Sequence, residues 1–325
     1  MNVSTVSDSV SLSTPVGADA GLTPKQLAAK YGLEVSGKRP GLIQYVKQLW
    51  ARRHFIVAFA TARLVAQYTT AKLGQVWQVL TPLLNCAVFY LVFGVILKSR
   101  ETVPVYIAWL CVGVFVFQFS QSAIQSGTRS ISDNLGLIRA LHFPRASMPV
   151  AFTVIQLQQL LISMVVLVAI VLLSGITPGP TWLLIIPALL LQCGFNTGLA
   201  LVMARVGSKA SDISQLMPFI LRTWMYVSGV MYSVQAQIAN YPPFVRTITE
   251  LNPASVYMDL MRYAFMPESF SPKAYPGGLN AAGEAQPHWL TLPNHVWMIA
   301  VAWAVFAFVL GFVFFWKAEE EYGRG

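Results

Sequence analysis

Long runs of apolar residues alternate with short polar connections along most of this chain. A helix needs about 20 mainly apolar residues to cross the hydrocarbon core of a bilayer. Six runs reach that length, at about 75–97, 104–125, 148–174, 181–204, 213–234 and 295–316. Segments of about 10 residues with alternating polarity, which are typical of membrane β-barrels, do not occur. The pattern therefore predicts six transmembrane helices.

Composition leads to the same class of protein. The 325 residues are 55% hydrophobic and only 11% charged, and the mean hydropathy is +0.57. This is too little charge to cover the surface of a water-soluble globule of this size. The cysteines Cys86, Cys111 and Cys193 lie within apolar runs, without the spacing of a disulfide or metal site. The sequence predicts an all-α integral membrane protein with no metal.

The basic residues predict the orientation of the chain in the membrane. Sixteen of the 22 Lys and Arg residues lie before the first run, after the second and fourth, and after the last. Lys and Arg concentrate on the cytoplasmic side of membrane proteins. Both termini are therefore expected in the cytoplasm, with residues 1–40 as a polar tail and 67–325 as the membrane domain. This asymmetry and anionic lipid explain the net charge of +9, so no nucleic-acid partner is expected.

Residues 41–66 predict an amphipathic helix lying in the membrane interface, before the first span. Leu42, Val46 and Leu49 fall on one helical face, and Lys47 and Arg52 fall largely on the other. Basic amphipathic helices next to a span usually lie in the plane of the headgroups. The alternative is a helix packed on another soluble domain.

The connection between the second and third runs contains a short predicted helix, 135–141, between Asn134 and Pro144. Leu137, Ile138 and Leu141 would form an exposed apolar ridge on it. A short helix of this kind is suited to docking into a groove on a partner. The alternative is an ordinary loop.

The connection 235–294 is expected on the outer side of the membrane. Its apolar blocks are too interrupted to span and too apolar for a plain loop. Irregular backbone at membrane depth is tolerated where protein or water surrounds it. We therefore expect two re-entrant half-helices that meet near Asn252 and Pro253.

Polar residues inside the predicted spans are candidates for a transport path. Such residues usually face the interior of a bundle or water, although they also serve as hydrogen bonds between helices. An arginine in mid-span, Arg222, costs several kcal/mol unless it is paired or hydrated, so it either binds an anionic cargo or pairs structurally. Flat aromatic side chains can stack on sugar rings. The candidates are Trp77, Gln78, Asn85, Phe89, Tyr90, Arg222, Trp224 and Tyr226.

Two further patterns bear on energy supply and helix packing. No GxxxxGK[ST] loop occurs, so this chain does not hydrolyse ATP by the P-loop route, and no catalytic residue is predicted. Gly194 and Gly198 match the GxxxG motif of closely packed membrane helices, which by itself is weak support for a dimer.

Three motifs in order resemble the membrane subunit of ABC-2 type polysaccharide ABC exporters. The pattern Y-x4-LG-x2-W-x4-P occurs at Tyr68, Leu73, Gly74, Trp77 and Pro82. The stretch NLGLIRALHFPR is similar to the family's coupling helix, with Asn134, Leu137, Ile138, Arg139, Leu141, Phe143 and Arg145. The stretch LNPASVYMDLMR is similar to its external motif, with Asn252, Pro253 and Arg262. The chain departs from the family's usual pattern at Ser211 and Gly229.

The resemblance implies a homodimer with two P-loop ATPase subunits that bind ATP and Mg, in a bacterial plasma (inner) membrane. It also implies that this chain carries no cofactor. The implied cargo is a polysaccharide on polyprenyl diphosphate, of galactan, O-antigen or teichoic-acid type, with galactan exporters the most similar branch. This cargo would enter from membrane lipid beside the interface helix, at Trp50, Arg52, Arg53, Arg63, Tyr68 and Lys72.

Two other functional classes compete with this interpretation. A stand-alone secondary transporter would need a coupling-ion site or inverted repeats, and neither is visible. A polyprenyl-lipid transferase or scramblase would need catalytic carboxylates or metal ligands in the cytoplasmic loops, where only Asp133 and Asp212 occur. A neighbouring gene for a P-loop ATPase would exclude both.

Overall fold

A computed structural model describes residues 23, 26–27, 30–31, 40–69, 72–99, 103, 105–140, 143–234, 242–270, 292, 295–320 and 322. The chain divides into two units, 1–40 and 41–325. Within the first unit, Gln26, Leu27 and Lys30 are helical. In the second unit, the regular elements among the described residues are all helices.

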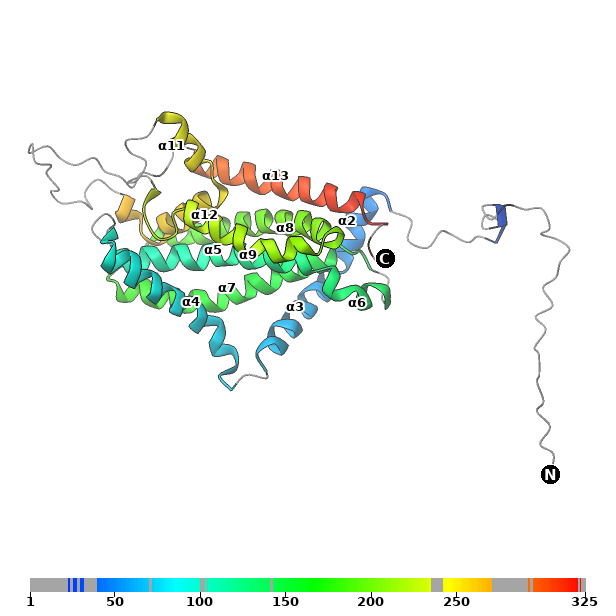
Figure 1. Cartoon of the computed structure of the whole chain (residues 1–325), viewed down its shortest axis with the longest axis horizontal. Coiled ribbons are helices and arrows are strands. Elements are labelled where there is room, and N and C mark those ends of the chain that lie inside the picture. Colours follow the sequence, from blue (N-terminus) through cyan, green and yellow to red (C-terminus); the bar gives the residue numbers. More distant parts are fainter. Residues whose placement is uncertain are drawn as a thin grey trace, which may run out of the picture. The chain divides into compact units, whose positions relative to one another are not determined.

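The second unit is a bundle of helices (Figure 1). The α-helices have the bounds α2 Leu42–Ala51, α3 Arg53–Tyr68, α4 Trp77–Phe89, α5 Tyr106–Arg129, α6 Leu135–Ala140, α7 Ser147–Leu173, α8 Ile185–Lys209, α9 Asp212–Val227, α11 Pro243–Glu250, α12 Pro253–Phe265 and α13 Val296–Lys317. A π-helical segment, Tyr90–Ile96, continues α4. Short 3₁₀ turns are Gly74–Val76, Ser132–Asn134, Pro180–Leu184 and Pro267–Phe270.

Five helical stretches of the described chain are long and apolar enough to cross a membrane. They are Trp77–Ile96, Tyr106–Arg129, Ser147–Leu173, Pro180–Lys209 and Val296–Lys317. The prediction of an all-helical, multi-pass membrane protein is confirmed. The predicted fifth span, 213–234, is the 16-residue helix α9. It ends before Gly229, whose φ of 68° lies in the left-handed region that commonly terminates helices. A sixth crossing therefore stays a prediction.

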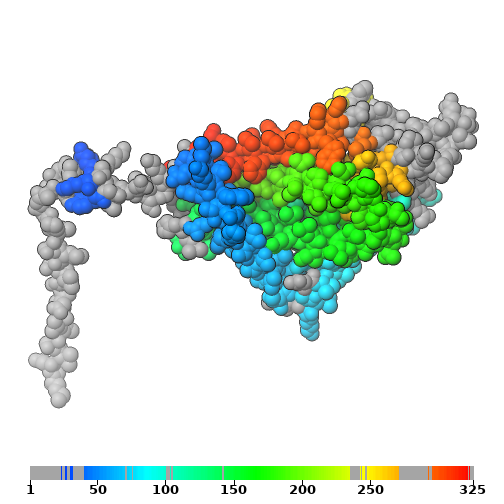
Figure 2. Space-filling view, turned by 180° about the vertical axis from the view of Figure 1, so that it is seen from behind, coloured from blue at the N-terminus to red at the C-terminus, as the bar shows by residue number. Residues whose placement is uncertain are grey.

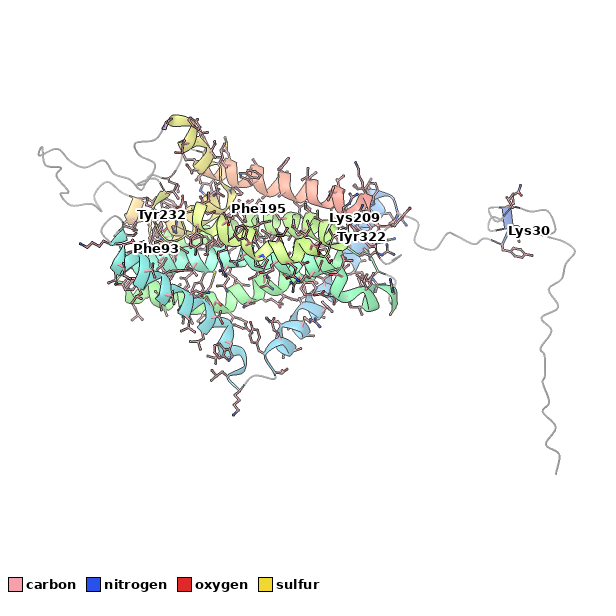
Figure 3. The ribbon with its side chains drawn as sticks, viewed as in Figure 1. Lys30, Phe93, Phe195, Lys209, Tyr232 and Tyr322 are labelled. Atoms are coloured by element: carbon pink, nitrogen blue, oxygen red, sulfur yellow. The ribbon has the colours of Figure 1, made fainter. Side chains whose placement is uncertain are left out.

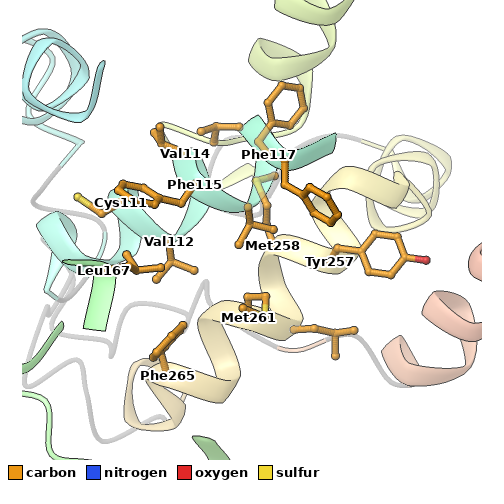
Figure 4. Close-up of a cluster of buried hydrophobic side chains, with 14 of the residues drawn as sticks. Cys111, Val112, Val114, Phe115, Phe117, Leu167, Tyr257, Met258, Met261 and Phe265 are labelled. Carbon is orange, nitrogen blue, oxygen red and sulfur yellow. The ribbon is translucent and has the colours of Figure 1, made fainter. Parts of the chain in front are cut away.

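Helix α5 is the central element of the bundle. It contacts α4, α7, α8, α9 and α12, and Trp109, Phe115 and Phe117 along it are almost fully buried. Figure 4 shows side chains of α5 facing Tyr257, Met258, Met261 and Phe265 of α12, with Leu167 of α7 beside them. The buried surface of α12 thus makes it part of the core.

Helices α8 and α13 approach each other closely enough to require glycine. A methyl group added at Gly198 would overlap the backbone carbonyl of Ala307, and one added at Gly311 would overlap the carbonyl of Gly198. Small residues allow membrane helices to pack with their backbones nearly in contact. Of the two glycines in the GxxxG pair, Gly198 is therefore the one that makes a close helix contact, and this contact lies within one subunit.

The two ends of the bundle carry different elements. Figure 3 places Lys209 and Tyr322 at one end, and Phe93 and Tyr232 at the other. Helices α2 and α6 lie at the first end and α11 lies at the second (Figure 1). The connection that holds α6, the end of α8 at Lys209 and the stretch after α13 thus share one end, as their positive charge predicts.

The predicted interface helix, 41–66, consists of two helices that meet at Arg52. Helix α3 packs on α7, where Ala60 and Leu64 are buried in a cluster with Ile155. The outer face of α2 leaves Ile43 and Trp50 about 70% exposed. This arrangement, apolar residues facing outward beside exposed basic ones, is typical of helices at a membrane surface.

Candidate functional site

Helix α6 is the candidate docking element, and only part of it is accessible. Ile138 is 6% exposed in an apolar cluster with Tyr45 of α2 and Phe315 of α13, and Leu137 packs against the same cluster. The prediction that Leu137, Ile138 and Leu141 form an exposed ridge is therefore wrong at Ile138, which faces the bundle, and Leu137 is half-buried. The accessible positions of α6 are Gly136, Arg139 and Ala140. Leu141 lies outside the described residues.

The residues that flank α6 fix its position. The Asn134 side-chain amide donates to the carbonyl of Ser130 at 3.0 Å. The ring of Phe143 lies 5.5 Å from that of Phe55 in α3. The backbone N–H of Arg145 donates to Glu319, which follows α13, at 3.0 Å. Of the predicted coupling residues, these three are thus anchors, and Arg139 lies on the outer surface.

A polar cavity lies between α4, α5 and α7. It has a volume of about 290 Å³ and is lined by four glutamines and two serines, together with apolar residues. The polar lining consists of Gln78, Gln118, Gln156, Gln159, Ser122 and Ser163. Gln78 is 1% exposed, and neither polar atom of its side-chain amide has a hydrogen-bond partner among the described residues. Unpaired buried amides are costly, so water or hydroxyl groups that hydrogen-bond to Gln78 would be stabilised in this cavity.

Sequence reasoning found Gln78 but missed the α7 side of this cavity. The side-chain amide of Gln159 donates to the Tyr68 hydroxyl at 3.2 Å, and the Ser163 hydroxyl donates to the backbone carbonyl of Gln78 at 3.3 Å. The signal that could have found them is the stretch QLQQ, 156–159, inside an otherwise apolar span. Three glutamines in four residues of a membrane helix need polar surroundings.

The remaining path candidates do not gather at this cavity. Trp77 and Asn85 lie exposed on α4, while Phe89 and Tyr90 are half-buried against the core. The indole N–H of Trp224 donates to the Asn252 side chain at 3.0 Å. This hydrogen bond joins α9 to the turn before α12.

Arg222 lies on an exposed, mostly apolar face of α9 and pairs with no other described residue. The residues exposed around it are Leu216, Phe219, Ile220, Thr223, Tyr226 and Val227. A guanidinium on an apolar face of this kind is expensive in lipid unless water, an anion or another protein surface meets it. Water, an anion or another protein surface beside Arg222 would therefore lower the cost of this face of α9.

The external motif forms a structural junction. Asn252 caps α12 by accepting from Ala254 N–H at 3.2 Å, and its amide donates to the Ser228 hydroxyl at 3.0 Å. Helices α11 and α12 meet at this capped turn, where two half-helices were predicted. That they are re-entrant stays a prediction.

Arg262 is the second part of this junction. Its guanidinium lies 3.3 Å from the centre of the Trp109 ring and donates to the carbonyl of Val230 at 3.1 Å. It also pairs with Asp259 at 3.2 Å. A methyl group added at Gly113 would overlap the guanidinium, so the glycine makes room for it. Asp259 and Arg262 also border a cleft of about 560 Å³ near the end of α11.

The residues predicted beside the cargo's point of entrance lie on α2, α3, the junction between them and the turn after α3. Arg53 donates to the Trp50 carbonyl at 3.2 Å, and its guanidinium lies 5.4 Å from the Trp50 ring. Arg52, Arg63 and Lys72 are exposed. Burial raises the pKa of Tyr68, whose hydroxyl accepts from Gln159. Tyr68 thus links this surface to the polar cavity.

Comparison with known proteins gives consistent matches. The family model of the ABC-2 type transporter matches residues 55–266, which run from α3 to the end of α12. The chain is 25% identical over 195 residues to the O-antigen export system permease protein RfbA of Myxococcus xanthus, a match that covers 59% of this chain and 73% of that protein. It is 24% identical over 179 residues to an O-antigen export system permease protein RfbA of Klebsiella pneumoniae, covering 55% and 68%.

Proposed function

Because this chain belongs to the ABC-2 type transporter family, we propose that it exports a lipid-linked polysaccharide across a bacterial plasma membrane. It is a non-catalytic membrane subunit, and a partner ATPase hydrolyses the ATP. The observation that carries the cargo class is the similarity to O-antigen export permeases. The proposed cargo is a glycan on polyprenyl diphosphate, and galactan as the particular sugar stays a prediction.

The proposed assembly is two copies of this chain with two ATPase subunits, which bind ATP and Mg. The support for a second copy is the exposed face of α9, where Arg222 has no partner among the described residues. Two such faces opposite each other would enclose a hydrated path in which Arg222 meets the diphosphate of the cargo, because guanidinium groups bind phosphate oxygens strongly. The α6 end would face the cytoplasm, as the positive residues predict.

The proposed docking surface for the ATPase is the accessible face of α6. We expect the double change Arg139→Glu with Ala140→Asp to reduce the ATPase that copurifies with the tagged chain by about tenfold or more, since charge mismatch in an interface costs several kcal/mol. Ile138 is the wrong residue for this test because it is buried. The measurement is the ratio of the two proteins after purification in mild detergent.

Arg52→Glu is the matched control for this experiment. It reverses an exposed charge at the junction of α2 and α3, and the copurifying ATPase should stay at the wild-type ratio. Undiminished copurification of the α6 variant would refute the docking surface. A wild-type chain that purifies alone in several detergents, with no vanadate-sensitive ATP hydrolysis, would instead favour a secondary transporter or a transferase.

The polar cavity is proposed to hydrate the cargo path beside α4 or to receive hydroxyl groups of the cargo. Gln78→Leu removes two unpaired buried polar atoms, so it should leave the melting temperature unchanged or raise it. Export should nevertheless fall, since the cavity then lacks its most buried donor and acceptor. Surface polysaccharide and melting temperature would be measured together. Normal export by a stable variant would exclude the cavity from transport.

A further inference from the structure

Three segments that are far apart in the sequence meet on one buried carboxylate, Glu319. The Tyr45 hydroxyl of α2 donates to one of its oxygens, Oε2, at 2.7 Å. The backbone N–H of Arg145, in the connection from α6 to α7, donates to the other, Oε1, at 3.0 Å. The Tyr45 oxygen also accepts from the N–H of Ala146 at 3.0 Å. A side-chain nitrogen of Arg145, Nη1, donates in turn to the backbone carbonyl of Glu319.

The carboxylate and the phenol of this arrangement are buried, and Arg145 is half-buried. Glu319 is 7% exposed, Tyr45 is 1% exposed, and the Tyr45 ring lies 5.8 Å from that of Phe312 in α13. Figure 2 shows α2, in blue, against the red C-terminal end of α13. Burial raises the pKa of Glu319, while the hydrogen bonds from Arg145 and Tyr45 act in the opposite direction. A buried carboxylate is expensive, and an apolar side chain of similar size would be the cheaper way to fill this space.

The same cluster contains the inner face of α6. Ile138 packs with Tyr45, Phe315 and Tyr322. Helix α6 is therefore held from two sides, by its own apolar face and by the polar contacts immediately after it. Any displacement of α6 must either carry α2 and the end of α13 with it or break these contacts.

We propose that Glu319, Tyr45 and Arg145 form a clasp that transmits movement of α6 to the interface helix α2 and to the end of α13. The inference rests on the proposed function, in which α6 docks the ATPase and the cargo enters beside α2. The three are positioning residues that touch neither nucleotide nor cargo. Their polar chemistry gives the junction a fixed geometry, because both carboxylate oxygens and the phenol oxygen are engaged at once.

The test uses the full chain in complex with its ATPase, reconstituted in lipid vesicles with lipid-linked glycan as cargo. Tyr45→Phe keeps the ring and removes both hydrogen bonds of the hydroxyl, and Glu319→Gln keeps the size of the side chain. We expect both variants to retain ATPase copurification and basal ATP hydrolysis. The cargo moved per ATP should fall about fivefold or more, the usual scale of a coupling between sites.

Tyr322→Phe is the matched control, because it deletes another buried hydroxyl of the same cluster, one that donates to the Phe315 carbonyl. Its cargo-to-ATP ratio should equal that of the wild type. The double variant Tyr45→Phe with Glu319→Gln should be no worse than either single variant, because both act on one clasp.

Several outcomes would overturn the clasp. One is an unchanged cargo-to-ATP ratio in the Tyr45→Phe and Glu319→Gln variants. Another is a parallel decline of melting temperature, ATP hydrolysis and export, because that would indicate a purely structural role. If Glu319→Gln fails to fold, the milder Tyr45→Phe decides by the same ratio. Failure of the proposed function is separate, since the wild-type chain would then bring down no ATPase and show no ATP-dependent cargo movement.

Discussion

Replacing Arg262 with methionine is expected to lower the free energy of unfolding by about 3–5 kcal/mol, the usual cost of removing one partner of a buried ion pair. Arg262 is 2% exposed, and its guanidinium donates to the backbone carbonyls of Trp109, Gly229 and Val230 at 3.4, 3.3 and 3.1 Å. Methionine would leave these acceptors and the Asp259 carboxylate without their donor. The measurement is the unfolding midpoint of the purified protein in detergent.

Arg222→Met is the control for this prediction. It removes the same group from an exposed, mostly apolar face with no partner in the described chain, so the free energy of unfolding should stay unchanged or rise. The two variants compare a buried arginine, Arg262, with an exposed one, Arg222, and both lie near apolar segments of the sequence. If Arg262→Met melted like the wild type, the junction of α5, α9 and α12 would not depend on this guanidinium.

Gly198→Ala should destabilise the bundle by about 1–3 kcal/mol, the usual cost of overpacking. The added methyl group would overlap the carbonyl of Ala307, which is backbone and cannot rotate away. Helices α8 and α13 would have to separate along a contact in which Gly311 faces the Gly198 carbonyl. Thermal unfolding in detergent measures the effect.

Gly194→Ala, one turn earlier on α8, is the matched control. Its added methyl group would meet only the Ala304 side chain, at 3.9 Å, which is an ordinary contact. Alanine also favours the helix over glycine by about 1 kcal/mol, so this variant should be as stable as the wild type or more so. A Gly198→Ala variant that kept its stability but lost a dimer would show that the contact is between subunits instead.

Sequence reasoning predicted the membrane helices because a bilayer imposes a length and a polarity that one segment can satisfy alone. The runs 75–97, 104–125, 148–174, 181–204 and 295–316 became helices of membrane length. The run 213–234 did not, because hydropathy does not register the helix end at Gly229. The motifs also singled out Asn252 and Arg262, although the contacts of these residues with α9 and α5 involve segments that are distant in sequence.

Hydropathy and charge along the chain determined the helical class, the approximate spans and the expected sidedness, because each of these depends on residues close together in sequence. Only the tertiary structure decided which face of α6 is accessible, that Gln78 meets the glutamines of α7, and that Gly198 is used within the subunit. It also brought Tyr45, Arg145 and Glu319 together across 274 positions of sequence. Such contacts arise from how whole helices pack, and no local pattern of residues encodes the neighbour that each face will meet.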